Sequence, residues 1–255
     1  MCYAFDAAPP LHGRAVTAAA SESLVLTAAD GARFAAHLAV PERPSGMGVL
    51  VLPDNNGLSH FYETLTVRLA EQGHTALAID YFGRTAGPDH RSRDEGFREM
   101  GQLIRHLVQL TPAGLDADMA AAAEHLRSSG ARQVVSLGFC FGGRQAFRTA
   151  APEFGTAGAV GFYGFPDAVN GSPGPTQLAS ELTAPILAFW GGADEAIPQT
   201  AVEAFDGALA EAGCPREFVT YEGAPHGFFE QGAHEFAEAS ADAWRRVLDF
   251  IAPRP

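Results

Sequence analysis

The sequence predicts an α/β fold in which a mostly parallel central sheet carries helices on both faces. Short apolar runs alternate with longer stretches of helical periodicity along most of the chain, a pattern typical of parallel sheets. A length of 255 residues suits one large domain with a well-covered core. Since no repeat or low-complexity linker interrupts the pattern, we expect a single domain over residues 23–255, preceded by an alanine- and proline-rich arm at residues 1–22.

The expected elements begin with a hairpin, because the strand-like residues 23–27 and 33–40 flank the turn pair Asp30-Gly31. Strands and helices alternate after it. The remaining strands are expected at residues 48–52, 75–79, 133–137, 158–162, 185–190 and 217–221. The helices are expected at residues 60–72, near 94–110, and at 115–128, 144–151, 200–211 and 234–251. The irregular stretch at residues 165–177 could cover a site or be an ordinary surface loop.

The sharp turn between the strand at residues 133–137 and the following helix is the most informative segment. Its sequence, GFCFGG at residues 138–143, places Cys140 at the apex with glycines two positions before and after it. Glycine allows backbone segments to cross closely, and the apex residue of such a turn is strained. The layout is that of a nucleophile elbow with sulfur in place of oxygen, and the adjoining helix N-terminus favours a thiolate. The alternative is a small buried cysteine that only packs in the core.

A cysteine nucleophile needs a base and an orienting carboxylate, and two later strand ends supply candidates. Asp194 follows the strand at residues 185–190, and His226 follows the strand at residues 217–221. Open parallel sheets place their ligands beyond the carboxyl ends of the strands, where Cys140, Asp194 and His226 all fall. The order of nucleophile, acid and histidine along the chain is that of α/β-hydrolases. The sequence therefore predicts a catalytic triad of these three residues.

These segments resemble the dienelactone hydrolase family, and the resemblance extends from about Ser23 to about Ile251. The matching motifs are GFCFGG at residues 138–143, GGAD at 191–194 followed by Ile197-Pro198, and YEGAPHGF at 221–228. The resemblance implies an α/β-hydrolase fold without a large cap domain. It also implies hydrolysis of enol lactones through a triad of cysteine, histidine and aspartate.

The turn after the strand at residues 48–52 holds further residues that the resemblance assigns to the site. In the family, a glutamate in this turn contacts the resting thiol and helps to gate its activation. Here Asp54 takes that place, with a side chain one methylene shorter. The N–H of Asn55 is expected to join that of Phe141, the residue after the nucleophile, in an oxyanion hole. The alternative is that Asp54 and Asn55 only form a polar turn or a helix cap.

Substrate recognition departs from the family pattern. The family's arginine shortly after the catalytic histidine is absent, and the apolar and acidic stretch GFFE occupies residues 227–230. Glu230 near the pocket would repel a dicarboxylate product, so we expect a substrate other than the dienelactone acid. Two arginines and three aromatic residues are candidate substrate contacts, although each could be an ordinary surface or core residue. These candidates are Arg84, Arg98, Tyr81, Trp190 and Phe228.

The composition limits the partners and cofactors. A formal net charge of −13 argues against nucleic acid or anionic membranes as partners, and no apolar run reaches membrane-spanning length. The seventeen basic residues are all arginine, which excludes Schiff-base chemistry, pyridoxal phosphate and a P-loop lysine. The three cysteines form no pair typical of zinc or redox sites, so we expect no metal, no cofactor and a cytoplasmic location.

The leading functional hypothesis is hydrolysis of a small-molecule lactone or activated ester through an acyl-cysteine intermediate. A thiolate leaves a tetrahedral adduct more readily than an alkoxide does, so the substrate needs a good leaving group such as an enolate or a thiolate. A transferase or cyclase that uses the same acyl-cysteine is one alternative. A non-catalytic protein that binds a ligand or senses oxidants through Cys140 is another. The residue pattern leaves the natural substrate and the oligomeric state open.

Overall fold

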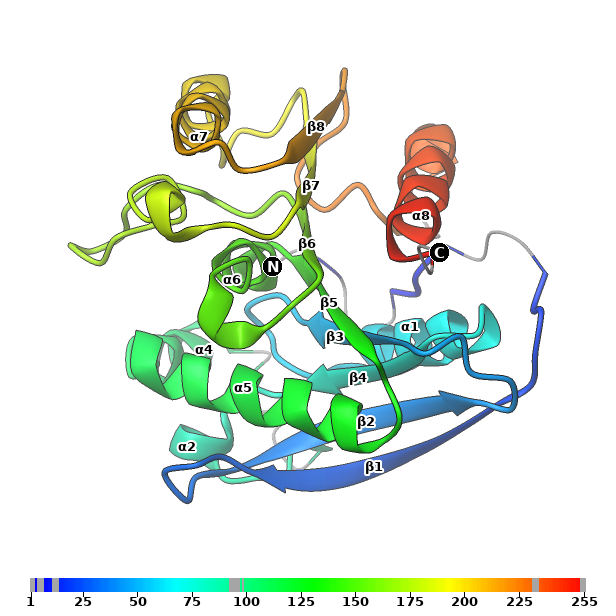
Figure 1. Cartoon of the computed structure of the whole chain (residues 1–255). Helices are drawn as coiled ribbons and strands as arrows, with labels where there is room; N and C mark the ends of the chain where they lie inside the picture. The colour runs from blue at the N-terminus through cyan, green and yellow to red at the C-terminus, as the bar shows by residue number, and fades with distance from the viewer. Residues whose placement is uncertain are drawn as a thin grey trace.

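An eight-stranded sheet runs through the middle of the computed structural model, which describes residues 3, 7–10, 14–91, 97, 99–230 and 234–252 (Figure 1). The strands lie side by side in the order β1-β2-β4-β3-β5-β6-β7-β8. β2 pairs antiparallel with both of its neighbours, and all the other neighbouring strands pair in parallel. The strands are β1 (Ala19–Thr27), β2 (Arg33–Pro41), β3 (Met47–Leu52), β4 (Thr75–Ile79), β5 (Gln133–Phe139), β6 (Gly158–Phe162), β7 (Ile186–Gly191) and β8 (Arg216–Tyr221).

Helices cover both faces of this sheet, as the sequence predicts. Figure 1 shows α1 and α8 on one face and α5, α6 and α7 on the other. The described α-helices are α1 (His60–Glu71), α2 (Gly83–Ala86), α4 (Met100–Leu107), α5 (Pro112–Ser128), α6 (Phe141–Arg148), α7 (Gln199–Ala212) and α8 (Ala237–Ile251). The 3-10 turns that lie wholly within the described residues are η2 (Pro152–Phe154), η3 (Ala179–Glu181) and η4 (His234–Phe236).

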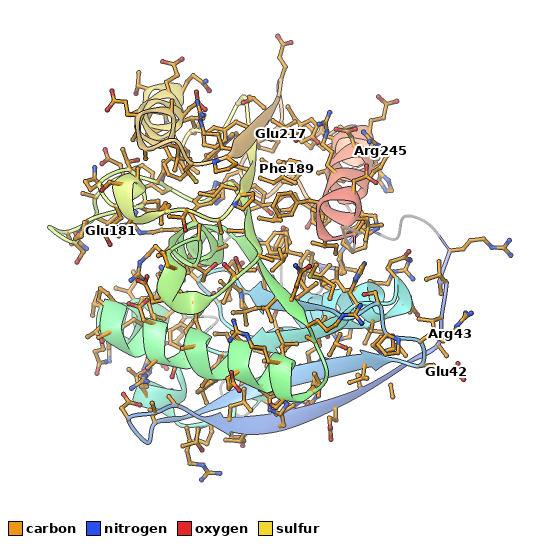
Figure 2. The ribbon with its side chains drawn as sticks, in the orientation of Figure 1. Glu42, Arg43, Glu181, Phe189, Glu217 and Arg245 are labelled. Atoms are coloured by element: carbon orange, nitrogen blue, oxygen red, sulfur yellow. The ribbon has the colours of Figure 1, made fainter. Side chains whose placement is uncertain are left out.

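The central strands are largely apolar because helices cover them on both sides. β3, β4 and β6 are buried at every residue, as expected for parallel strands in the middle of a sheet. Figure 2 shows Phe189 of β7 in the interior, whereas the charged side chains of Glu217 and Arg245 point outward. Among the described residues, no helix is long and apolar enough to cross a membrane.

Three elements begin at least three residues earlier than the sequence pattern predicts, namely β1, α5 and α6, and α6 starts at Phe141 rather than at residue 144. β1 starts at Ala19, inside the predicted arm, because the backbone from that residue onward pairs with β2 as far as Pro41. α5 starts at Pro112 rather than at residue 115. The hydroxyl of Thr111 accepts a hydrogen bond from the N–H of Gly114 at 3.2 Å, and proline suits the first position of a helix.

The connections beyond the strand ends contain no large cap within the described part of the chain. Residues 163–185, between β6 and β7, form a loop with the single short turn η3. The helix predicted near residues 94–110 is observed as α4, while residues 92–96 and 98 lie outside the described part. The predicted α/β-hydrolase fold without a large cap is confirmed for the part that the structure describes.

Candidate active site

The turn after β5 has the strained geometry that its glycines predict. Cys140 has φ 53° and ψ −114° and lies immediately before α6. A Cβ added at Gly138 would lie 2.0 Å from the carbonyl oxygen of Gly142, and one added at Gly142 would lie 2.1 Å from that of Leu52. Both positions therefore need glycine, and the crossing backbone holds Cys140 at the end of the strand.

Asp194 and His226 meet beyond the ends of β7 and β8. His226 Nδ1 lies 2.6 Å from Asp194 Oδ2, while Asp194 Oδ1 accepts hydrogen bonds from the N–H groups of Ala196 at 2.8 Å and Ile197 at 3.2 Å. The Asp194 side chain is only 2% exposed. Because both carboxylate oxygens are engaged, the acid is fixed in place and orients the imidazole.

Electrostatics at His226 favour its protonated form. Burial alone lowers the pKa of an imidazole, but hydrogen bonds to Asp194 and Cys140, together with their negative charges, outweigh it and raise the pKa of His226 to about 9. The histidine thus faces the sulfur on one side and the carboxylate on the other. This arrangement can hold a proton beside a thiolate and can later deliver it to a leaving group.

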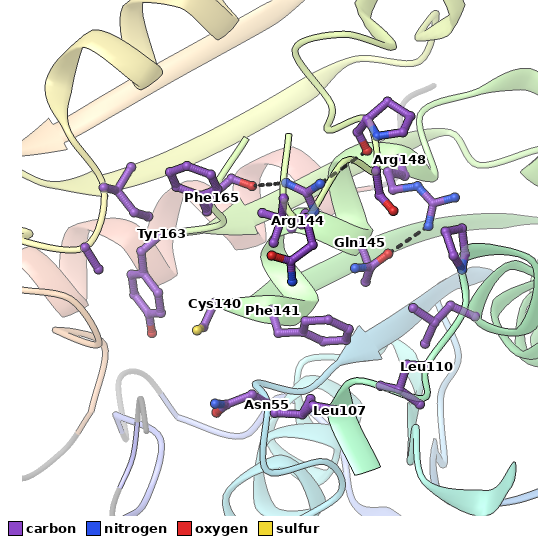
Figure 3. Close-up of a pocket in the computed structure, with 18 of the residues that line it drawn as sticks. Asn55, Leu107, Leu110, Cys140, Phe141, Arg144, Gln145, Arg148, Tyr163 and Phe165 are labelled. Atoms are coloured by element: carbon purple, nitrogen blue, oxygen red, sulfur yellow. Dashed lines mark hydrogen bonds between the residues drawn. The ribbon is translucent and has the colours of Figure 1, made fainter. Parts of the chain in front are cut away.

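The two residues expected to form the oxyanion hole lie beside the cysteine. Asn55, in the turn after β3, and Phe141, at the start of α6, line the same pocket as Cys140 (Figure 3). The first N–H groups of a helix have no acceptor within the helix, so that of Phe141 is available to an oxygen in the pocket. The turn after β3 and the start of α6 therefore approach the sulfur together.

Asp54 directly precedes Asn55 in the chain and is almost completely buried. Its carboxylate accepts hydrogen bonds from Asn56, one from the backbone N–H at 2.9 Å and one from the side-chain amide at 3.2 Å. Burial raises the pKa of Asp54 to about 7, the negative charge of Cys140 adds to this rise, and the bonds from Asn56 oppose it. Asp54 and the sulfur therefore influence each other's ionisation.

The structure brings none of the described candidate substrate contacts to the wall of the pocket. Trp190 and Phe228 are buried in the core, and Tyr81 is buried behind Phe141 with its hydroxyl donating to a backbone carbonyl. The guanidinium of Arg84 is bound by Asp118 at 2.8 Å and also by Asp30. Arg98 lies outside the described residues.

Glu230 is also absent from the lining of this pocket, and its N–H donates to the carbonyl of Phe228. The expected repulsion of a dicarboxylate product by Glu230 therefore finds no support in the structure.

Sequence reasoning missed one wall of the pocket. Arg144, Gln145 and Arg148 of α6 line it, and Leu107 and Leu110 lie across from them (Figure 3). The sequence could have indicated the two arginines, because residues spaced by four along a helix share a face and Cys140 lies immediately before this helix. No sequence pattern marked Leu107 and Leu110, since only the folded chain brings the end of α4 and the segment after it to the site.

Tyr163 links the pocket to the N-terminal residues. It has a positive φ of 38°, and its ring centroid lies 4.9 Å from that of His226. Its hydroxyl shares a hydrogen bond with the hydroxyl of Tyr3, which is buried and stacks on Phe61 with ring centroids 4.0 Å apart. No feature of the sequence distinguishes Tyr3, because the contact spans 160 positions along the chain.

Among the described residues, no group of three or more histidine, cysteine, aspartate or glutamate side chains could hold a metal ion. The reactive groups that the described residues bring together in this pocket are the sulfur, the imidazole, the carboxylates and the backbone N–H groups.

A sheet of this order, with a strained turn after β5, is the framework of the α/β-hydrolases. Within that class the chain belongs to the dienelactone hydrolase family, whose model matches residues 34–254. The resemblance inferred from the three motifs is thereby confirmed, and the protein is a hydrolase of the dienelactone hydrolase type.

Named relatives agree with this assignment. A Salmonella typhimurium protein provisionally named carboxymethylenebutenolidase is 31% identical over 214 residues, which cover 80% of this chain and 76% of that protein. The carboxymethylenebutenolidase of Rhodococcus opacus is 29% identical over 217 residues, or 81% of each chain. The crystal structure of a provisionally assigned dienelactone hydrolase from Klebsiella pneumoniae gives a TM-score of 0.78 at 27% identity, covering 92% of this chain and 100% of that one.

Proposed function

We propose that the protein hydrolyses a lactone or an activated ester of the enol-lactone type through an acyl-cysteine intermediate. In this proposal Cys140 is the nucleophile, His226 the general base and acid, and Asp194 the residue that orients the histidine. The observation that supports it most is the 2.6 Å contact of His226 with Asp194, made by an imidazole that also hydrogen-bonds Cys140. A nucleophile, a base and an orienting acid in hydrogen-bond contact are the arrangement that acyl transfer needs.

The first half of the proposed reaction transfers the acyl group to sulfur. The Cys140 thiolate attacks the carbonyl carbon, a C–S bond forms, and the carbonyl electron pair moves to oxygen. The N–H groups of Asn55 and Phe141 stabilise this oxyanion, and each such donor is typically worth about 3–4 kcal/mol. When the adduct collapses, the bond to the leaving oxygen breaks and His226 donates a proton to that oxygen. A lactone opens in this step and stays bound as a thioester.

The second half releases the acid. His226, now neutral, takes a proton from a water molecule as that water attacks the thioester carbonyl. The oxyanion forms again in the same place, and its collapse breaks the C–S bond and returns Cys140 as a thiolate beside a protonated His226. The cycle consumes one water and needs no other co-reactant.

Asp54 has a modulating role in this proposal. Its buried carboxylate carries a pKa near 7 because of burial and of the nearby negative charge at Cys140. By reciprocity, a charged Asp54 opposes ionisation of the sulfur. Asp54 would thus take part of the role that glutamate has in the family, acting through charge.

The substrate in this proposal is a small molecule with a good leaving group. A thiolate is expelled from a tetrahedral adduct more easily than an alkoxide, so only an enolate, an activated alkoxide or a thiolate leaves in preference. The relatives named carboxymethylenebutenolidase point to enol lactones as the first substrates to try. A reducing cytoplasm would keep the reactive thiol from oxidation.

The test combines turnover with chemical trapping. Hydrolysis of a dienelactone and of p-nitrophenyl acetate is followed by ultraviolet absorbance for the wild type, Cys140→Ala and Cys214→Ala. Cys214 is a matched control because it is buried, and burial raises the pKa of its thiol. We expect activity to be lost only in Cys140→Ala, and rapid-quench mass spectrometry to find the acyl group on the peptide that contains Cys140. Equal turnover by Cys140→Ala and the wild type would refute the proposed nucleophile.

A further inference from the structure

The cavity at the candidate active site is much larger than the space around the proposed catalytic residues. It measures about 720 Å³ and extends from Cys140 and His226 to the segment between α4 and α5. Figure 3 shows it running from Cys140 past Phe141 toward Leu107 and Leu110. Pockets of about 300–1,000 Å³ typically enclose most of a drug-sized ligand. A compact lactone bound at the sulfur would leave the far part of this cavity empty.

Most of the side chains that line this cavity are apolar. Two groups of apolar side chains contribute, one from the end of α4 to the first turn of α5 and one from the loop and turn that follow β6, a loop that also places the polar Asn170 and Ser172 in the lining. The first group is Leu107, Val108, Leu110, Pro112 and Leu115; the second is Phe165, Val169, Pro173 and Leu178. Facing apolar walls of this kind favour a hydrophobic ligand, because each buried methylene gains free energy on leaving water.

The charged side chains on the remaining wall already have protein partners. Arg148 donates to Asp116 and Gln145, both at 2.9 Å. Arg144 donates to the backbone carbonyls of Phe165 at 2.9 Å and Pro173 at 3.2 Å, and to that of Asp167. Arg144 therefore holds the loop that forms the second apolar group, and both arginines can offer their aliphatic stems to the cavity.

Exposed apolar side chains continue the cavity toward the surface along α4. Met100, Ile104 and Val108 recur every four residues and so lie on one face of the helix, at 46%, 48% and 71% exposure. Val108 belongs to the pocket wall and to this stripe at once. Among the described residues, seven large hydrophobic side chains are exposed, and four of them are these three and Val169, which also lines the cavity.

We propose that the substrate carries an apolar arm, which lies in the cavity along Leu107, Val108 and Leu110 and emerges beside the exposed face of α4. This inference rests on the proposed function and specifies its substrate class: a lactone, ester or thioester with a neutral alkyl or aryl arm. The arm is recognised by burial of hydrocarbon, so its length sets the rate at low substrate concentration.

The test uses two series of model substrates. In one, p-nitrophenyl esters carry acyl chains of two, four, six and eight carbons; in the other, phenyl acetates carry alkyl chains of increasing length on the ring. Each methylene that leaves water can contribute up to about fourfold, so we expect kcat/KM to rise at least about tenfold along one of the series. Values that stay flat or fall along both series would overturn the proposal.

Variants locate the arm. We expect Val108→Ser and Leu110→Ala to lower the ratio of kcat/KM for the longest and shortest chains at least about threefold. The matched control is Val25→Ser on β1, which is also exposed, lies outside the pocket lining and should keep the wild-type ratio. Unchanged ratios in both pocket variants would overturn the proposal.

Two further outcomes would also overturn it. A clear preference for a chain that ends in a carboxylate, over the neutral chain of equal length, would show that Arg144 or Arg148 selects an anion. A change of mass by light scattering in Val108→Ser would show that the α4 stripe is covered by a second copy of the chain. The proposed function is tested separately, because acetate hydrolysis that depends on Cys140 would support it whatever the chain-length result.

Discussion

At the scale of single residues, the contact between Asp194 and His226 sets the orientation and the pKa of the imidazole that exchanges a proton with Cys140. Asp194→Asn keeps the shape of the side chain but removes the charge that helps to raise the pKa of His226. We expect the pKa of His226 to fall and kcat/KM for p-nitrophenyl acetate to drop about 10³–10⁴-fold, as an amide orients the imidazole poorly. Asp206→Asn is the control, since Asp206 is exposed and pairs with Arg216, and this variant should keep wild-type activity.

Comparable activity in the Asp194 and Asp206 variants would contradict the role given to Asp194. A histidine that needs no orienting acid would then have to be held by other contacts, such as the ring of Tyr163 beside it.

The buried carboxyl of Asp54 predicts a pH dependence of stability. Its pKa is raised by burial from 3.8 to about 7 in the folded protein, so the folded state binds more protons than the unfolded state between these values. Stability due to this group therefore falls as pH rises from about 4 to about 7, and the full penalty is present above pH 7. We expect Asp54→Asn to raise the free energy of unfolding in urea by about 2–4 kcal/mol at pH 8 and by much less at pH 4.5. An equal effect at both pH values would contradict this prediction.

The catalytic candidates were predictable as single residues, whereas their surroundings were not. Cys140, Asp194 and His226 each follow the end of an apolar strand, a position that chain order alone reveals. Arg84 also follows a strand end, but Asp30 and Asp118, which come from distant parts of the chain, bind its guanidinium, and Arg84 does not line the pocket. Side-chain partners of this kind depend on folded proximity, which a single sequence does not display.

At the scale of elements, the close contact of α6 with the end of β3 fixes the position of Cys140. A Cβ at Gly142 would lie 2.1 Å from the carbonyl oxygen of Leu52 and 2.2 Å from that of Pro53. Backbone atoms cannot yield to such a clash without moving the helix away from the strand. We expect Gly142→Ala to lower the free energy of unfolding by about 3 kcal/mol or more, measured by urea denaturation, and to abolish turnover.

Gly207→Ala gives the matched control for this prediction. Gly207 lies inside α7, and a Cβ there would meet no atom within 4 Å. Alanine is the better helix former, so this variant should gain up to about 1 kcal/mol. If Gly142→Ala proved as stable as Gly207→Ala, the close crossing would not exist in solution.

Element types followed from the sequence more readily than element ends. Apolar periodicity identified the strands and helices, because each must bury one stripe or face. The observed starts of β1 and α5 lie earlier than the predicted ones. Pairing with β2 extends β1, and capping by Thr111 extends α5. The chain before α8 forms the 3-10 turn η4, although the helical pattern begins at residue 234.

At the scale of the whole molecule, the alternation of strands and helices predicted a parallel sheet but not the order of its strands. β3 lies between β4 and β5, and it contributes the turn that carries Asn55 beside Cys140. That neighbourhood follows from the family resemblance, since nothing in the apolar pattern of β3 selects its partners. The N-terminal residues were predicted only as an arm, yet Tyr3 packs against α1 and reaches Tyr163.

This contact predicts that Tyr3 supports the site from 160 positions away. Tyr3→Ala removes a buried ring stacked on Phe61, so we expect a loss of about 3–5 kcal/mol in the free energy of unfolding. Tyr3→Phe keeps the ring and removes only the hydroxyl that forms a hydrogen bond with the hydroxyl of Tyr163. It should cost about 1–2 kcal/mol and lower kcat several-fold, because the ring of Tyr163 lies against His226.

Val16→Ala is the control for the Tyr3 variants, as Val16 is exposed and also precedes β1. It should change stability by less than about 0.5 kcal/mol and leave kcat unaltered. Urea denaturation and initial rates on p-nitrophenyl acetate measure the two effects separately. If Tyr3→Ala were as stable and active as Val16→Ala, the contacts of Tyr3 would be dispensable for the fold and the site. A loss of stability with unchanged kcat in Tyr3→Phe would limit the contact to a structural role, because the position of Tyr163 beside His226 would then not depend on the shared hydroxyl.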